Sequence, residues 1–306
     1  MKKLVILFLL LVITESVQAR NVWVDTDLAC GNSRTTDVDD CLALTYLFNR
    51  KDINIVGVST VFGNASEEIV FERLKEFLNI YQRSYPNFKA PPVFRGAKKR
   101  KNRYANAPRT EASKEIEKFF RSNQGELYLL GPSTNLAAVI EKNSDVIRNI
   151  HKILFIAGKK DEGRRFFPNG KSILLSFRDF NFHKDKYSFK TVLASNTNLH
   201  LAGYDLATQE LFNSKSLENL GINKPLGPYL KKNIQGWERY WKESFSLSGF
   251  YPFDLSAVRS ILNPEKYNCY STKLKLHAFN FFFFEILKSL QVGFGNRDIT
   301  FCDKNH

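Results

Sequence analysis

The chain has 306 residues, of which 43% are hydrophobic and 25% are charged, and its formal net charge is +14 at pH 7. It contains neither a Pro/Gly/Ser-rich linker nor an internal repeat, so this length favours one large domain with a two-sided core. The positive charges are scattered apart from the run KKRKNR at 98–103, and no basic-aromatic nucleic-acid motif interrupts them. We therefore expect a solvated basic surface and no nucleic-acid partner.

Residues 1–19 have the pattern of a secretory signal peptide. A positively charged start (Lys2 and Lys3) precedes an unbroken apolar run from Leu4 to Ile13, and Ala19 supplies the small residue at the cleavage site. The pattern predicts cleavage after Ala19, a mature domain at 20–306, and a periplasmic or secreted protein. An uncleaved N-terminal anchor is the alternative. The other apolar cluster, at 279–284, is too short to span a membrane and is expected in the core.

Apolar, β-rich runs alternate with helical patterns along the rest of the chain. Strands are expected at 22–26, 54–60, 126–130, 152–157 and 197–203, and helices at 39–50, 66–81, 110–121, 134–142 and 185–194. This alternation predicts an α/β fold, a single domain with a mostly parallel central sheet and helices on both faces. In such sheets ligands bind at the carboxyl ends of the strands, where we expect the site.

The first of these strand ends is unusually acidic. The stretch VWVDTDLACGNSRTTDVDDCLAL (22–44) holds five aspartates. Carboxylates this close raise one another's pKa, and a hard cation such as Ca²⁺ or Mg²⁺ relieves the conflict. The five histidines are far apart in sequence and no C-x-x-C pair exists, so zinc is disfavoured. The alternatives are a solvated loop with N-capping aspartates and, from the D-x-D pattern, an aspartyl phosphatase.

Four cysteines remain in the expected mature chain. Cys30 and Cys41 flank the acidic loop, and Cys269 and Cys302 lie near the C-terminus. Export would allow disulfide bonds, and a Cys30–Cys41 bond would staple the loop. Buried free thiols fit the sequence equally well, so both states stay open.

The segment VDTD followed by DVDDCLAL resembles the opening motif of the inosine-uridine preferring nucleoside hydrolases, roughly D-x-D-P-G-x-D-D-x-x-A-L. Other segments that resemble this family follow in the family's order: VSTVFGNAS (58–66), VFRGA (93–97), LYLLGPSTNLAAVI (127–140), HKILFIAGK (151–159), RDFNFHKD (178–185) and YPFDLSAVRSILNPEKY (251–267). The resemblance covers about residues 21 to 270, and a chance match of so many ordered segments is improbable.

The resemblance implies a Ca²⁺-dependent hydrolase that cleaves the N-glycosidic bond of a nucleoside or related riboside. The implied Ca²⁺ ligands are Asp27, Asp40, Asp254 and the backbone carbonyl of Thr134, and Asp27 also resembles the group that takes a proton from the attacking water. The implied ribose contacts are Asp39, Asn64, Asn169, Asp179 and Asn181. A homo-oligomer is possible. The alternative function is a ribose- or nucleoside-binding protein of the same fold with little catalysis.

The sequence departs from the family pattern mainly at the end that would bind the base. Phe253 stands where the family often has a histidine, which removes the obvious proton donor to the leaving group. The acidic loop carries an insertion, and Leu28-Ala29 replaces the usual Pro-Gly. Candidate residues for the base end are Trp237, Tyr240, Trp241 and Tyr251, although aromatic residues of this kind are as commonly core.

Overall fold

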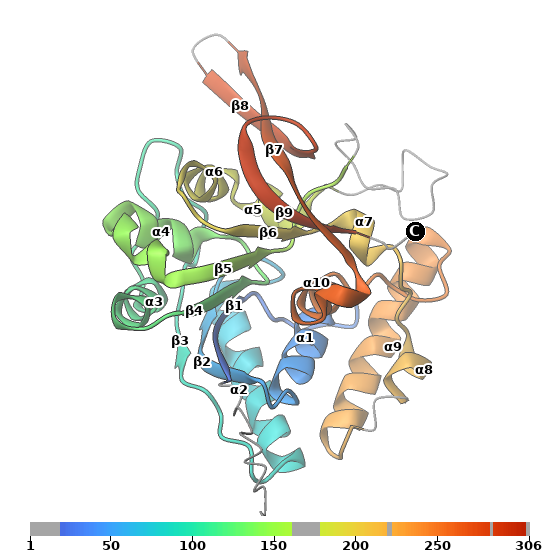
Figure 1. Ribbon diagram of the computed structural model, residues 1–306. Coiled ribbons are helices and arrows are strands. Elements are labelled where there is room, and N and C mark those ends of the chain that lie inside the picture. The colour runs from blue at the N-terminus through green and yellow to red at the C-terminus, as the bar shows by residue number, and fades with distance from the viewer. Residues whose placement is uncertain (1–18, 161–177, 219–221, 282–283, 304–306) are drawn as a thin grey trace, which may run out of the picture.

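A computed structural model describes residues 19–160, 178–218, 222–281 and 284–303 (Figure 1). Its centre is a nine-stranded sheet with the order β3-β2-β1-β4-β5-β6-β9-β7-β8. The strands are β1 (Arg20–Thr26), β2 (Ile53–Thr60), β3 (Val93–Phe94), β4 (Gly125–Leu129), β5 (Ile150–Phe155), β6 (Leu199–Ala202), β7 (Asn268–Phe281), β8 (Phe284–Val292) and β9 (Arg297–Asp303).

The sheet is parallel from β3 to β9, and only β7 runs against its neighbours β9 and β8. The predicted fold class is therefore confirmed. β3 and the C-terminal strands β7, β8 and β9 were not among the predicted strands. The apolar cluster at 279–284, expected in the core, falls where β7 turns into β8, and its side chains lie outside the described residues.

Helices cover both faces of the sheet (Figure 1). The helices are α1 (Asp39–Phe48), α2 (Glu67–Ser84), α3 (Glu111–Ser122), α4 (Thr134–Lys142), α5 (Phe180–Lys184), α6 (Lys186–Ala194), α7 (Tyr204–Ala207), α8 (Ser214–Glu218), α9 (Leu226–Phe245) and α10 (Phe253–Leu262), with short 3-10 turns η1 (Ser144–Asn149) and η3 (Pro264–Lys266). None of the helices in the described segments is long and apolar enough to cross a bilayer.

The alternation of side chains along β1 shows why the sheet has two cores. Val22 and Val24 are buried in one apolar cluster, with residues of α1, α2, α9 and α10. Trp23 points to the other face, into a second cluster with residues of α3, α4 and α6. A strand buried on both faces must be apolar throughout, which accounts for the continuous run that precedes the aspartates.

The carboxyl ends of the central strands meet at one edge of the sheet. β1 ends beside Asp25 and Asp27, and the segment after β2 passes so close that a Cβ on Gly63 would overlap the Asp27 carboxylate. Leu130 follows β4 directly, and its N–H donates to the Asp25 carbonyl at 2.8 Å. The topology therefore gathers residues from distant parts of the sequence at this edge.

Asn135, in the first turn of α4, ties these strand ends together. Its amide nitrogen donates to the Asp25 carboxylate and to the Thr60 carbonyl, each at 2.9 Å. Its oxygen accepts from the Ala97 N–H at 3.0 Å and from the Thr110 hydroxyl at 3.1 Å. The side chain is fully buried, so water cannot replace these partners.

We expect Asn135→Ala to lower the free energy of unfolding by about 2–4 kcal/mol, because the substitution leaves several buried polar groups without partners. Urea denaturation measures this loss. Asn123→Ala is the matched control, since Asn123 is exposed and its amide donates only to the Phe119 carbonyl. A loss no larger than that of the control would contradict the role given to Asn135.

Candidate active site

A cavity of about 850 Å³ opens at this edge of the sheet. One wall is the acidic loop after β1, the floor includes Asp27, Asn64 and Leu130, and aromatic side chains of α9 form a second wall. A third wall is α5 with the residue before its N-cap, Arg178. The cavity lies in the upper part of the range for small-molecule sites, roughly 300–1,000 Å³.

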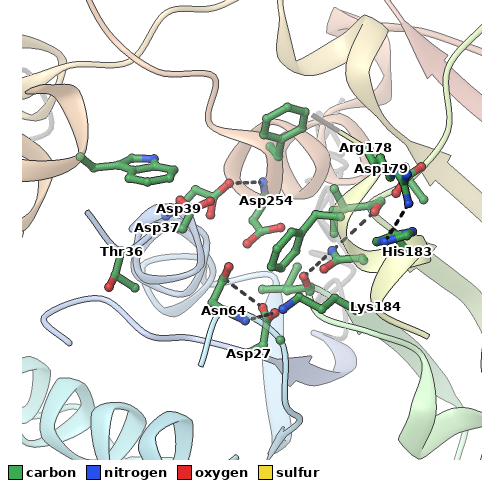
Figure 2. A pocket seen from close by; sticks show the side chains of 18 of the residues that line it. Asp27, Thr36, Asp37, Asp39, Asn64, Arg178, Asp179, His183, Lys184 and Asp254 are labelled. Carbon is green, nitrogen blue, oxygen red and sulfur yellow. Dashed lines mark hydrogen bonds between the residues drawn. The ribbon is translucent and has the colours of Figure 1, made fainter. Parts of the chain in front are cut away.

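Four buried carboxylates, Asp27, Asp39, Asp40 and Asp254, lie together at the acidic end of the cavity. Asp27, Asp39 and Asp254 line the cavity and are labelled in Figure 2. Oxygen atoms of Asp39, Asp40 and Asp254 lie within 4.8 Å of one another. Asp27 joins them through Asn64, whose amide nitrogen donates to Asp27 Oδ1 and to Asp40 Oδ2, each at 3.3 Å. The Asn64 N–H also donates to Asp27 Oδ2 at 2.9 Å, so both Asp27 oxygens are held in place.

The start of α1 positions two of these aspartates. Asp37 Oδ1 accepts from the N–H groups of Val38 at 2.7 Å and Asp39 at 3.2 Å, which fixes the first turn. The Thr26 hydroxyl donates to Asp40. The N–H of Asp254, in the first turn of α10, donates to Asp39 Oδ2 at 3.1 Å, which joins the two ends of the chain.

Burial and mutual repulsion make this cluster electrostatically unfavourable as it stands. Burial, and then the charge of Asp40, raise the pKa of Asp27 well above its usual range. Burial and the charges of Asp39 and Asp40 do the same to the pKa of Asp254. Burial raises the pKa of Asp39 to about 6 and that of Asp40 to about 7. Within the described residues no lysine or arginine pairs with these four carboxylates.

The structure thus brings together three of the four groups expected to bind metal, and adds one. Asp27, Asp40 and Asp254 meet at one place, and Asp39, which was expected only as a ribose contact, lies within the same cluster. Asp39 lines the cavity as well, so it is available to a ligand from that side.

The structure does not place Thr134 among the residues that line the cavity. Its side chain is fully buried and its hydroxyl donates to Asp185 Oδ2 at 2.7 Å, away from the cavity lining. Leu130 lines the cavity instead, and its carbonyl accepts from the Asn181 amide at 2.8 Å. Leu130 is the residue directly after β4, so the strand-end rule, applied to this position, would have indicated it from the sequence.

Two further predicted ribose contacts lie on the α5 side. Asp179 and Asn181 both line the cavity. Asp179 caps α5, accepting from the N–H groups of Gly158 at 2.6 Å and Phe182 at 3.3 Å, and burial raises its pKa to about 6. Asn169 lies outside the described residues.

The aromatic wall contains most of the residues expected at the base end. Trp237, Tyr240 and Trp241 of α9 line the cavity, and the rings of Trp237 and Tyr240 stack with centroids 5.0 Å apart. Tyr251 lies behind this wall, packed against Trp241 and Phe253. Phe253 itself lines the cavity. An apolar, partly exposed wall of this kind suits a flat heterocyclic ring.

The inserted loop is anchored at two places, by a disulfide and by a hydrogen bond from α9. Cys30 and Cys41 form a disulfide that joins the loop to the first turn of α1, and Cys269 and Cys302 form a second one between β7 and β9. The Tyr229 hydroxyl donates to the Cys30 carbonyl at 3.0 Å, which ties the loop to α9. The anchored loop presents Asp37 and Asp39 to the cavity.

Replacing both Cys30 and Cys41 with serine should lower the free energy of unfolding by about 3 kcal/mol. The two cysteines are 11 residues apart, and without the disulfide the unfolded chain between them gains conformational entropy. Thermal denaturation under non-reducing conditions measures the loss. The double variant Cys269→Ser/Cys302→Ser is the control. Loss of the Cys30–Cys41 disulfide should also raise the KM of a substrate held by Asp39, whereas loss of the Cys269–Cys302 disulfide should not. Equal KM values in the two variants would contradict the positioning role.

Comparison with known proteins identifies the family. The model of the inosine-uridine preferring nucleoside hydrolase family matches residues 22–289. The chain belongs to this family. It is therefore a hydrolase that acts on N-glycosyl bonds, which sets aside the aspartyl phosphatase considered from the D-x-D pattern.

Relatives and solved structures agree with this assignment. The chain is 23% identical over 254 residues to uridine nucleosidase 1 of Arabidopsis thaliana, covering 74% of this chain and 72% of that one. It is 23% identical over 251 residues to probable uridine nucleosidase 2 of Oryza sativa subsp. japonica, with the same coverage. An inosine-guanosine nucleoside hydrolase superimposes with a TM-score of 0.71 and 19% identity, over 93% of this chain and 94% of that one.

Proposed function

We propose that this nucleoside hydrolase cleaves ribonucleosides or related ribosides to free base and ribose with the help of a bound Ca²⁺ ion. The observation that carries the proposal is the buried cluster of Asp27, Asp39, Asp40 and Asp254, of which all but Asp40 line a cavity that also has an aromatic side. The names of the relatives support nucleosides as the substrate class.

The donor set fits a hard divalent cation. All the candidate ligands are oxygen atoms, which Ca²⁺ and Mg²⁺ prefer, and Ca²⁺ tolerates the irregular, many-oxygen geometry that carboxylates and a carbonyl provide. Burial, and after it the charges of neighbouring aspartates, raise the pKa values of Asp27, Asp40 and Asp254, and a cation between these groups would relieve that repulsion. Asp27, Asp40, Asp254 and the Leu130 carbonyl would hold the ion, with Asp39 next to it. When bound, such an ion supplies positive charge that acidifies and orients water.

The protein groups then perform distinct tasks in the hydrolysis. Asp27, fixed by two hydrogen bonds from Asn64, accepts the proton of the attacking water as general base. Asp39 and Asn64 bind ribose hydroxyls, which holds the anomeric carbon in an attackable position. The sugar develops oxocarbenium character as the C1′–N bond breaks, and the surrounding carboxylates stabilise that positive charge.

The base end has no evident proton donor at position 253. A phenylalanine ring cannot protonate a leaving base, and general acids commonly contribute 10²–10⁴-fold to a rate. We expect slower cleavage of inosine than of an activated riboside such as p-nitrophenyl riboside, whose leaving group needs no proton.

A nucleoside panel with Ca²⁺ tests the proposed function. Inosine, uridine and p-nitrophenyl riboside are incubated with the enzyme, and free ribose and free base are measured. Release of both in equal amounts, abolished by a chelator and restored by Ca²⁺, is the expected result. Tight ribose binding without release from any substrate would instead identify a binding protein, and restoration by Mg²⁺ but not Ca²⁺ would reject the assignment of the ion.

We also infer that the protein is exported and cleaved after Ala19. The two disulfides support this, since such bonds persist in oxidising compartments. N-terminal sequencing of protein from its native host should give Arg20 as the first residue. A soluble protein that retains Met1 would refute export.

A further inference from the structure

The α5 wall of the cavity is positively charged, and the proposed cleavage of nucleosides does not use this charge. Arg178, His183 and Lys184 all line the cavity. A guanidinium nitrogen of Arg178 lies 3.3 Å from His183 Nε2, and the Lys184 ammonium lies 4.7 Å from the centre of the Phe180 ring. Within the described residues neither Arg178 nor Lys184 pairs with a carboxylate.

The surroundings add further positive charge to this wall. Burial, followed in order by the charges of Lys186, Arg178, Arg100 and Lys184, lowers the pKa of His183 to about 4, so its ring is neutral near pH 7 and marks the positive charge around it. Arg100 belongs to the basic run at 98–103, and the Lys101 N–H donates to Asp185 Oδ2 at 2.9 Å, which anchors the run beside α5. The basic run is therefore held beside α5, with Arg100 close enough to act on His183.

Asp179 is the acidic residue on the same wall. Its two oxygens accept from the backbone N–H groups of Gly158 and Phe182, so its charge is directed toward the backbone and not toward the two cations, Arg178 and Lys184. The cations remain available to an anion that enters the cavity.

The shape of the cavity indicates where such an anion would be on a substrate. A ribofuranoside extends in three directions: the 2′- and 3′-hydroxyls, the base at C1′, and the 5′-carbon. Under the proposed function, the hydroxyls face Asp39 and Asn64 and the base faces the aromatic wall of α9. The 5′-carbon is then left facing the third wall, α5. Figure 2 shows Asp37 and Asp39 on one side and Arg178, Asp179 and His183 on the other, with Asp254, Asn64 and Asp27 between them.

We propose that this enzyme acts on ribosides that carry a phosphate at the 5′ position, with Arg178, His183 and Lys184 as the phosphate subsite. The inference rests on the proposed function and narrows its substrate class. Water attacks C1′, its proton passes to Asp27, the C1′–N bond breaks, and the base leaves with the bonding electrons and takes a proton from solvent. The phosphate ester stays intact, so the products are the free base and ribose 5-phosphate.

Kinetics with matched substrates test the inference. We compare, as a ratio, kcat/KM for uridine 5′-monophosphate with kcat/KM for uridine, and kcat/KM for inosine 5′-monophosphate with kcat/KM for inosine. Ribose 5-phosphate is quantified as the product, because free ribose would indicate that the substrate lost its phosphate before cleavage. The wild-type ratio should exceed about ten, because charge-assisted contacts to a phosphate contribute roughly ten- to a hundredfold each. Arg178→Gln and Lys184→Gln should each lower the ratio about tenfold or more.

Two exposed residues provide matched controls. Arg148→Gln and Lys118→Gln remove the same charges from side chains that are 80% and 77% exposed and do not line the cavity, so the ratio should not change. Cleavage of uridine at least as efficient as that of its monophosphate would overturn the inference while leaving the proposed function standing.

A binding experiment separates the two hypotheses if no substrate is cleaved. Absence of cleavage counts against the proposed function alone, and calorimetry with ribose 5-phosphate and ribose then decides the subsite. At least tenfold tighter binding of ribose 5-phosphate, lost in Arg178→Gln, supports the inference. Equal binding of the two sugars overturns it.

Discussion

Asp27→Asn should reduce kcat by about 10³–10⁴-fold, with a smaller change in KM, when ribose release is followed at saturating Ca²⁺. General-base catalysis contributes 10²–10⁴-fold, and this carboxylate is also one of the proposed ligands of the ion. Asparagine has the same shape as aspartate but cannot accept the proton of water. Its amide nitrogen would also face one of the two Asn64 donors, where Asp27 presents an oxygen acceptor. The loss should therefore lie in the chemical step more than in substrate binding.

An exposed aspartate provides the control for Asp27→Asn. Asp145→Asn makes the same change at a 75% exposed aspartate in η1 and should leave kcat unaltered. The unfolding transition of each variant shows whether it is folded. A folded Asp27→Asn variant that retains a tenth or more of wild-type kcat would mean that another group accepts the proton, and the role given to Asp27 would be wrong.

Asp254→Asn should change the stability of the protein in opposite directions with and without Ca²⁺. In chelator at pH 8, above the raised pKa values of Asp39 and Asp40, removing one of four mutually repelling carboxylates should stabilise the fold. With Ca²⁺ at about 100 times its dissociation constant, the wild type should gain about 2.7 kcal/mol, and the variant, which lacks a ligand, should gain much less. The two proteins should therefore exchange rank.

The sign of the pH dependence follows from the same pKa values. A carboxylate whose pKa is raised in the folded state contributes most stability below its unfolded pKa and loses that contribution as the pH rises through the folded value. In chelator the wild type should thus lose stability from about pH 4 to pH 7, and Asp254→Asn should lose less. Asp298→Asn, at a 69% exposed site on β9, is the control for both experiments. Thermal curves that Ca²⁺ does not shift in the wild type would reject the metal site.

The sequence predicts the central sheet and the acidic end of the site because local patterns encode both. Apolar runs bounded by helical periodicity locate the parallel strands, and the strand-end rule then brings Asp27 and Asn64 together. The C-terminal strands were missed although their pattern is local: KLKLHA at 273–278 alternates with the period of a half-buried strand.

Other features could not be obtained from local pattern. Thr134 and Leu130 are four residues apart in one motif, and which of them faces the cavity depends on where β4 ends and α4 begins. The position of the positive charge beside α5 is also not encoded locally, because Arg178, His183 and Lys184 line the cavity only where α5 packs beside the end of β5. Tertiary packing decides both.

The bond between the Asp254 N–H and the Asp39 carboxylate spans 215 residues of sequence. A nascent chain in which α10 has not yet emerged from the ribosome already contains Asp27, Asp39 and Asp40. It cannot yet place Asp254 beside them. The proposed cation site would therefore form late in biosynthesis, after most of the sheet has been translated. An ion that binds only the completed arrangement cannot help early intermediates to form, so its stabilisation acts mainly by slowing the unfolding of the finished enzyme.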